Sequence, residues 1–173
     1  MREAIIHKRA SFLRDAVFAA SDGLVTTFAV VAGAQGATLG PDVVLILGFA
    51  NLFADGISMS SGAYLGVKSE MEFEKAEGDK HFSGASPIKQ AFVTFFAFDI
   101  AGLLPLLPFL FRVRETFLVS SFLVAILLFL VGIIKSLFTR KSWIRSGMEM
   151  SVVGGLAAFS AYAVGYLLEK FVT

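Results

Sequence analysis

Residues 115–135 read ETFLVSSFLVAILLFLVGIIK, and no charged side chain lies between Glu115 and Lys135. A helix of roughly 20 mainly apolar residues is long enough to cross the hydrocarbon core of a bilayer. This stretch therefore predicts a membrane-spanning helix, and it raises the question of how many others the chain contains.

Four more segments have the length and apolar content of a membrane span. With the first one, they lie at about 16–36, 41–66, 89–111, 115–135 and 146–168. The sequence therefore predicts an all-α integral membrane protein with five transmembrane helices in a single membrane domain, residues 1–173. Gly40-Pro41 predicts a tight turn between the first two spans, while Gly102, Pro105 and Pro108 predict a kink or an end within the third.

The composition supports this class and excludes others. Hydrophobic residues make up 56% of the 173, the mean hydropathy is +0.76, and only 17% of the residues are charged. The net charge of +1 gives no basic excess for binding nucleic acid. The absence of cysteine excludes disulfides, thiolate metal sites and cysteine nucleophiles.

The positive charges are unevenly divided between the two ends of the predicted spans. Only Arg112, Arg114 and Lys170 fall at one end, and the other twelve lysines and arginines fall at the opposite end. Because positive residues are enriched in cytoplasmic segments, this bias predicts a cytoplasmic N-terminus and a C-terminus outside. The twelve are Arg2, Lys8, Arg9, Arg14, Lys68, Lys75, Lys80, Lys89, Lys135, Arg140, Lys141 and Arg145.

Small residues recur four positions apart in several spans, a spacing that allows helix backbones to approach closely in lipid. The pairs are Ala19/Gly23, Ala29/Gly33, Ser58/Gly62/Gly66, Ser151/Gly155 and Ala161/Gly165. Packing alone explains most of them. Because five short helices are few to enclose a polar path, we expect the protein to act as a homodimer.

Three carboxylates fall in the middle part of predicted spans: Asp22, Asp55 and Asp99. Each costs about 2.5–3.5 kcal/mol on insertion scales, and intramembrane carboxylates usually have a function or a partner. Lys89, ten residues before Asp99, is the one lysine or arginine in these three spans, and it is too far along the helix to form an intrahelical ion pair. Asn51, Asp55 and Met59 are spaced at i, i+4 and i+8, so they share one helix face.

The chemistry of this set favours a transition metal. Carboxylates suit hard divalent cations, whereas a thioether is a soft ligand that Mg²⁺ and Ca²⁺ do not favour. Asp22, Asp55, Met59 and Asn51 therefore form a candidate path that favours Fe²⁺ or Mn²⁺ and leaves other first-row ions open. Carboxylates in a low-dielectric interior readily take up protons, so proton exchange is a natural coupling.

Each of these residues also has a structural interpretation. Met59 can be simple packing, and Asp22 can cap a helix after Ser21. Asp99 can belong to an irregular helix near Gly102. Glu149 stands four residues after Arg145 and is expected to form an interfacial ion pair with it.

A short acidic connection, residues 67–88, joins the second and third spans. On a helix, Glu70, Glu74 and Glu77 form one stripe, with Glu72 close by. These four glutamates are candidate ligands that gather cations before entry, and Met71, Asp79 and His81 stand near them. The alternative is a solvated helix whose lysines balance the acids. His7 and His81 are expected at the surface.

Four stretches resemble the vacuolar iron transporter family and occur in its order along nearly the whole chain. They are SDGLVTTFAVVAGAQGA (21–37), ADGISMSSGAYLGVKSE (54–70), SPIKQAFVTFFAFDIAGLLPLLPF (86–109) and GGLAAFSAYAVGYLL (154–168). The resemblance implies a five-helix homodimer that moves Fe²⁺, often also Mn²⁺, out of the cytoplasm in exchange for protons.

The resemblance also implies roles for particular residues. Asp22 and Met59 match the family's ion-handling aspartate and methionine, and Asp55 matches the aspartate of the ADG variant. Asn51 stands where some relatives carry Glu. The connection 67–88 is short, whereas many eukaryotic relatives have a long metal-binding domain there. This short form suggests a prokaryotic plasma membrane.

The leading hypothesis is therefore a proton-coupled exporter of Fe²⁺ or Mn²⁺ with no resident cofactor. A passive divalent-cation channel is the first alternative, and a non-transporting membrane protein that senses metal or acts as a scaffold is the second. An enzyme is not expected, because phosphate-binding glycine loops, HExxH and GxSxG are absent from the sequence.

Overall fold

The computed structural model describes residues 2–78 and 86–172, and every regular element in these ranges is helical. In the described ranges, five spans are long and apolar enough to cross a membrane, which confirms the predicted number. The elements are α1 (Arg2–Gly36), α2 (Pro41–Ala76), α3 (Pro87–Leu103), η1 (Leu104–Leu106), α4 (Leu107–Leu110), α5 (Thr116–Thr139) and α6 (Trp143–Val172).

The first two helices are longer than the apolar segments that predicted them. Helix α1 begins at Arg2 instead of near residue 16, and α2 continues to Ala76 instead of ending near residue 66. The added part of α2, VKSEMEFEKA, is rich in residues with high helix propensity, so the helix has no reason to end where the apolar run does. Much of the connection 67–88 is therefore helical.

The third span is irregular, as its glycine and prolines predict. Regular α-helix ends at Leu103, a 3₁₀ turn follows, and α4 completes the span. Pro108 has no backbone N–H to donate to the preceding turn. The carbonyl of Pro105 instead accepts a hydrogen bond of 2.7 Å from the Ser120 hydroxyl of α5, so the break is stabilised from a neighbouring helix.

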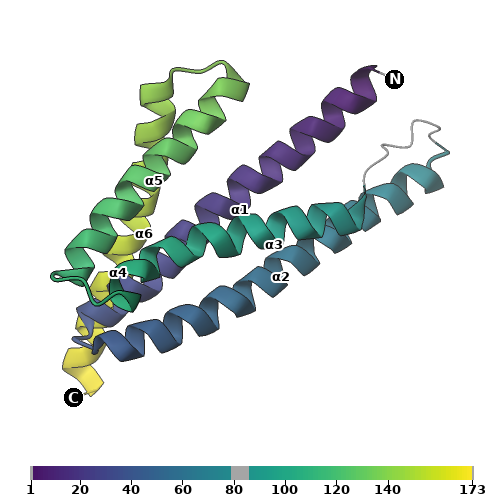
Figure 1. The fold of residues 1–173 in the computed structure, drawn as a ribbon. Coiled ribbons are helices and arrows are strands. Elements are labelled where there is room, and N and C mark those ends of the chain that lie inside the picture. The colour runs from purple at the N-terminus through teal and green to yellow at the C-terminus, as the bar shows by residue number, and fades with distance from the viewer. Residues whose placement is uncertain (1, 79–85, 173) are drawn as a thin grey trace.

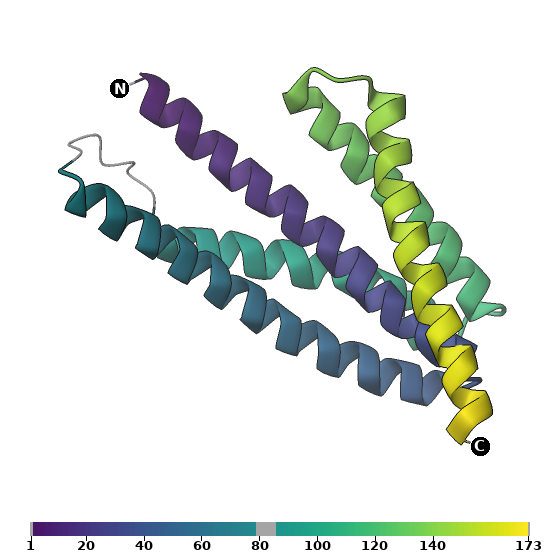
Figure 2. The same ribbon diagram turned by 180° about the vertical axis from the view of Figure 1, so that it is seen from behind.

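Helix α1 lies in the middle of the molecule and contacts α2, α3, α5 and α6. Figures 1 and 2 show α2 and α3 on one side of it and α5 and α6 on the other. The helices converge toward the end that holds the C-terminus and spread apart toward the end that holds the N-terminus. The interior of this arrangement is apolar and includes Leu24, Val31, Leu106 and Leu128.

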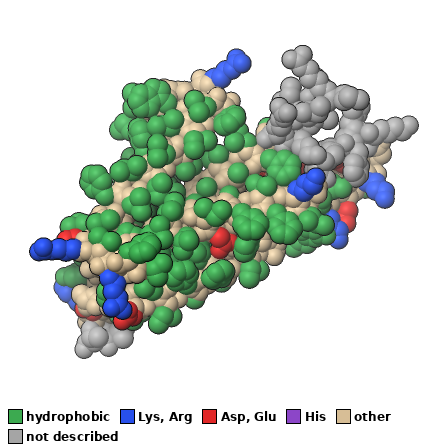
Figure 3. Space-filling model, in the orientation of Figure 1, with side chains coloured by type: hydrophobic (Ala, Val, Ile, Leu, Met, Phe, Trp, Pro, Cys, Tyr) green, Lys and Arg blue, Asp and Glu red, His purple; other side chains and the backbone are tan. Residues whose placement is uncertain are grey.

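The outward faces of the helices are also apolar. Large exposed side chains include Phe122 on α5 and Phe159 on α6, which are 76% and 72% exposed. Figure 3 shows one face covered mostly by hydrophobic side chains, with lysine and arginine side chains toward its two ends. Such a surface is stable against lipid and not against water, so the chain is an integral membrane protein.

Candidate functional site

Two of the predicted site residues lie on the neighbouring helices α1 and α2, near enough to interact electrostatically. The carboxylates of Asp22 on α1 and Asp55 on α2 are close enough for electrostatic repulsion, and both residues are half-buried. Asp55 also accepts a hydrogen bond of 2.9 Å from the Asn51 amide, one turn earlier on α2. The fold therefore brings Asp22, Asp55 and Asn51 into one polar cluster in the middle of two apolar helices.

Asp22 is not a helix cap. Helix α1 runs without a break from Arg2 to Gly36, so Asp22 lies deep inside it and the capping interpretation is wrong. The neighbouring hydroxyls bond to their own helix: Ser21 donates to the Val17 carbonyl at 2.6 Å, and Thr26 donates to the Asp22 carbonyl at 2.8 Å. The Asp22 carboxylate is thus the polar side-chain group of this segment that remains available to bind an ion.

Met59 lies at the edge of a small apolar cluster. It is half-buried and packs against Ala19, Leu52 and Phe98, which belong to α1, α2 and α3. Within one chain this contact agrees with a packing role. Met59 also follows Asp55 by one helical turn, so its thioether lies next to the polar cluster.

The polar cluster of one chain is a small ligand set. Among the described residues, no group of three His, Cys, Asp or Glu side chains is gathered in a way that holds a metal. Two carboxylates, one amide and one nearby thioether supply oxygen and sulfur donors that suit Fe²⁺ or Mn²⁺. They leave room for ligands from elsewhere, such as water or a second copy of the chain.

Asp22 also borders a cavity of about 620 Å³ between α1, α5 and α6. The walls are largely apolar, with Phe18 and Phe138 among them, and Arg14 and Lys135 also line the cavity. This space lies toward the end at which the helices spread apart (Figure 2). It gives Asp22 an approach from that end of the molecule.

The predicted acidic stripe lies on the last turns of α2. Glu70, Glu72 and Glu74 are helical, and Glu77 is the residue that ends the helix. Glu72 lies 3.9 Å from the Lys68 amine, and Arg14 of α1 attracts Glu70. These contacts agree with a solvated, charge-balanced helix as well as with a cation-gathering surface. Asp79 and His81 lie outside the described residues, and of His7 only the helical backbone is described.

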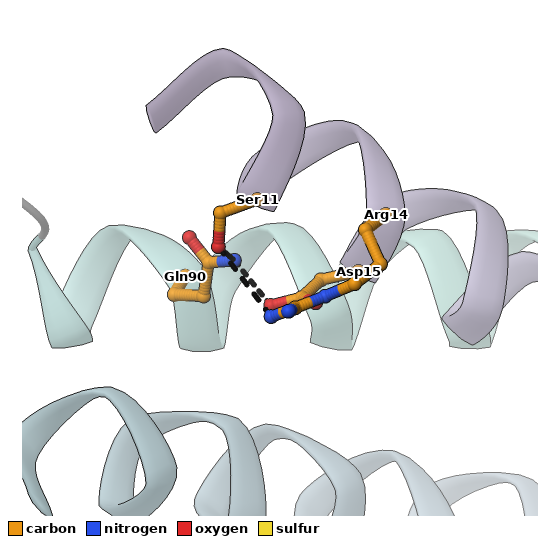
Figure 4. Close-up of polar contacts among 4 residues, drawn as sticks. All are labelled: Ser11, Arg14, Asp15 and Gln90. Atoms are coloured by element: carbon orange, nitrogen blue, oxygen red, sulfur yellow. Dashed lines mark hydrogen bonds and ion pairs between the residues drawn. The ribbon is translucent and has the colours of Figure 1, made fainter. Parts of the chain in front are cut away.

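A second polar cluster, which the sequence did not predict, joins α1 to α3 (Figure 4). The Gln90 amide, 2% exposed, donates to the Asp15 carboxylate and, at 3.2 Å, to the Ser11 hydroxyl. Arg14 pairs with the same carboxylate at 2.8 Å. A glutamine in an otherwise apolar segment was the available signal, but its partner lies 75 residues away.

The other intramembrane acids also differ from the simplest expectation. Glu149 of α6 pairs with Lys135 of α5 at 3.9 Å, where the sequence predicted Arg145 as its partner. Lys135 on the neighbouring helix α5 is thus placed to pair with Glu149, although Arg145 lies one turn earlier on the same helix. Asp99 lies on α3 and contacts Gly56 of α2, apart from the pair formed by Asp22 and Asp55.

The apolar surface, the five spanning helices and the carboxylate pair between α1 and α2 define a polytopic membrane protein with a polar site inside the membrane. The model of the VIT family matches residues 13–85 and 78–166, which together cover most of the chain. The chain belongs to the VIT family.

The relatives carry names that describe iron transport. The chain is 28% identical to a vacuolar iron transporter of Toxoplasma gondii, over 93% of this chain and 76% of that protein. It is also 28% identical to vacuolar iron transporter homolog 3 of Arabidopsis thaliana, over 93% and 85% of the two chains. The identity to vacuolar iron transporter 1 of Eucalyptus grandis is 25%, over 95% and 91%.

Two of these alignments are longer than the chain itself. They extend over 228 and 227 residues, whereas the chain has 173. Those two relatives therefore contain inserted residues within the matched region. This agrees with the prediction that the chain is a short form of the family.

Proposed function

We propose that this protein transports Fe²⁺ or Mn²⁺ out of the cytoplasm in exchange for protons. The observation that carries the proposal is the presence of two half-buried carboxylates, Asp22 and Asp55, on neighbouring apolar helices, near enough to repel each other. Placing two like charges there is costly, and a divalent cation between them removes the repulsion. The names of the relatives, vacuolar iron transporters, support iron as the cargo.

The donor set explains why a transition metal suits the site and why it can leave again. The carboxylates attract the cation, and the Met59 thioether favours Fe²⁺ or Mn²⁺ over Mg²⁺ and Ca²⁺. No cysteine is present in the chain to bind the ion tightly. An affinity of moderate strength suits a cargo that must be released on the other side.

The direction follows from the charge bias of the sequence. The end that is rich in lysine and arginine also carries Glu70, Glu72, Glu74 and Glu77, and we assign it to the cytoplasm. There the glutamates would raise the local concentration of cations near the cavity that Asp22 borders. Protonation of the carboxylates from the outer side would then weaken their hold on the metal.

The proposed unit is a homodimer. One chain supplies few ligands, and a second copy placed beside α1 and α2 would add the same set and enclose the path. The short form of the chain is our reason for proposing a prokaryotic plasma membrane as its location.

Metal flux into sealed proteoliposomes, with internal pH followed by a trapped dye, tests the proposal. Wild type is expected to move Fe²⁺ and Mn²⁺ across the membrane while protons move in the opposite direction. Asp22→Asn and Met59→Ala should each lower the metal flux at least tenfold. The matched controls Asp42→Asn and Met148→Ala change exposed residues and should retain it.

Other outcomes would indicate other functions. Metal flux that an imposed pH gradient cannot drive uphill would indicate a passive channel. Metal binding by the four glutamates without any flux would indicate a sensor or a scaffold. Wild-type flux in both Asp22→Asn and Met59→Ala would contradict the proposed path.

A further inference from the structure

Asp99 is a membrane-embedded acid that the proposed metal path does not use. It lies on the face of α3 that packs against α2, and both of its carboxylate oxygens are buried. In the described part of the chain, neither oxygen has a hydrogen-bond partner. The carboxylate presses directly against Gly56, where even a methyl group would overlap it.

In the described chain, no charged side chain pairs with the Asp99 carboxylate. The helices packed against α3 are chiefly α1 and α2, and the acids in the middle of these two spans are Asp22 and Asp55. Among the residues that the structure describes, Asp99 forms no ion pair with these helices or with any other element. An ionised carboxylate without a counter-ion, a donor or water is strongly disfavoured in such a place, whereas the neutral acid is tolerated.

A groove with hydroxyl groups begins one turn away. It lies between α2 and α3, has a volume of about 580 Å³, and is lined by Ser60, Ser61 and Tyr64 among apolar side chains. Ser60 follows Gly56 by four residues on α2, and Phe95, also on its wall, precedes Asp99 by four on α3. The groove therefore lies about one helical turn from Asp99, on the side toward the end that is rich in basic residues.

We propose that Asp99 carries a proton of the exchange that drives the metal uphill, at a site separate from the metal carboxylates, whose own protonation helps to release the metal. This assignment rests on the proposed metal–proton exchange. The proton enters or leaves along the groove of Ser60, Ser61 and Tyr64, and no bond other than O–H is formed or broken. The donor and the acceptor are water at the two membrane surfaces.

The position of Gly56 gives a means of coupling. Gly56 contacts Asp99 on one face of α2, and Asp55, the next residue back, interacts with Asp22 on another. Ionised Asp99 needs water or a donor, so α2 and α3 must separate to admit one. A shift of α2 moves Asp55 and Met59 at the same time. Metal and proton thus act on two neighbouring faces of one helix.

Asp99→Asn tests the assignment, because asparagine keeps the shape of the neutral acid and cannot release a proton. In proteoliposomes we expect Fe²⁺ flux down its own gradient to continue within about twofold of wild type. The accompanying proton movement and the uphill transport driven by a pH gradient should be lost. Infrared spectra should show a carboxylic acid band in wild type that is missing from Asp99→Asn and present in Asp42→Asn.

The outcomes separate the two proposals. Normal proton coupling in Asp99→Asn, or an unchanged carboxylic acid band, would overturn the role of Asp99 and leave metal–proton exchange intact. A wild type that moves metal without protons would overturn the exchange itself. If Asp99→Asn does not assemble, Asp99→Ser, which is smaller and equally unable to ionise, replaces it in both measurements.

Discussion

Gln90 is a buried amide whose hydrogen bonds hold α3 against α1. In Gln90→Leu, the Asp15 carboxylate would lose its donor from α3 and keep only Arg14. Leaving a buried acceptor unpaired costs about 1–3 kcal/mol. We therefore expect a lower thermal unfolding temperature in detergent.

The matched control is Gln35→Leu, the same chemical change on α1. Gln35 is half-buried, and its side chain makes no hydrogen bond within the described structure. It should unfold near the wild-type temperature. Equal unfolding temperatures for the two variants would show that the cluster of Figure 4 does not contribute to stability.

Single residues differ in how far the sequence predicts them. Asp22, Asp55 and Asp99 attract notice in a sequence because a charge inside an apolar segment is costly. That cost does not predict which of these three carboxylates lie near one another. Asp22 and Asp55 lie near enough to interact electrostatically, whereas Asp99 lies against Gly56. Asp15 and Gln90 were missed because each looks ordinary until the fold places them side by side.

Between elements, one close approach joins α1 to α6. The backbone carbonyl of Gly33 on α1 stands where a side chain at Gly165 of α6 would be. Gly165→Ala should force the helices apart and lower stability by about 1–3 kcal/mol, as overpacking does. Thermal unfolding of the purified protein measures the effect.

Gly155→Ala is the matched control, because it makes the same change on the same helix. Among the described residues, a methyl group there meets no atom of another helix within 4 Å. Its unfolding temperature should stay at or above that of wild type, since alanine is the better helix former. A loss as large as that of Gly165→Ala would refute the packing argument.

The small-residue pairs thus divide into two kinds. Gly23, Gly33 and Gly165 each lie against the backbone of a neighbouring helix, as their spacing predicts. Gly62 and Gly66, with the same spacing, have open space around them. The spacing indicates that one face of a helix carries small side chains. Only the packing decides whether another helix of this chain covers that face.

For the whole molecule, the orientation in the membrane is open to a direct test. The chain has no cysteine, so one introduced residue reports its own side. Ser142→Cys lies between α5 and α6 at the basic end, and Asp42→Cys lies at the start of α2 at the opposite end. A membrane-impermeant maleimide added to intact cells should label Asp42→Cys and leave Ser142→Cys unlabelled.

Permeabilised cells supply the control, because both variants should then react. The reverse pattern in intact cells would place the N-terminus outside and would reverse the direction of transport that we propose. Labelling of both sites before permeabilisation would contradict a single orientation in the membrane.

By itself, the sequence determined the class of the protein, the five spans, the break in the third span and the intramembrane acids. These properties depend on local composition and on the cost of placing polar groups in lipid. The tertiary structure alone decided which polar groups interact: Asp15 bonds to Gln90, Glu149 pairs with Lys135, Asp22 repels Asp55, and Asp99 has no hydrogen-bond partner among the described residues. Such contacts depend on how helices distant in sequence pack and rotate, which no local pattern specifies.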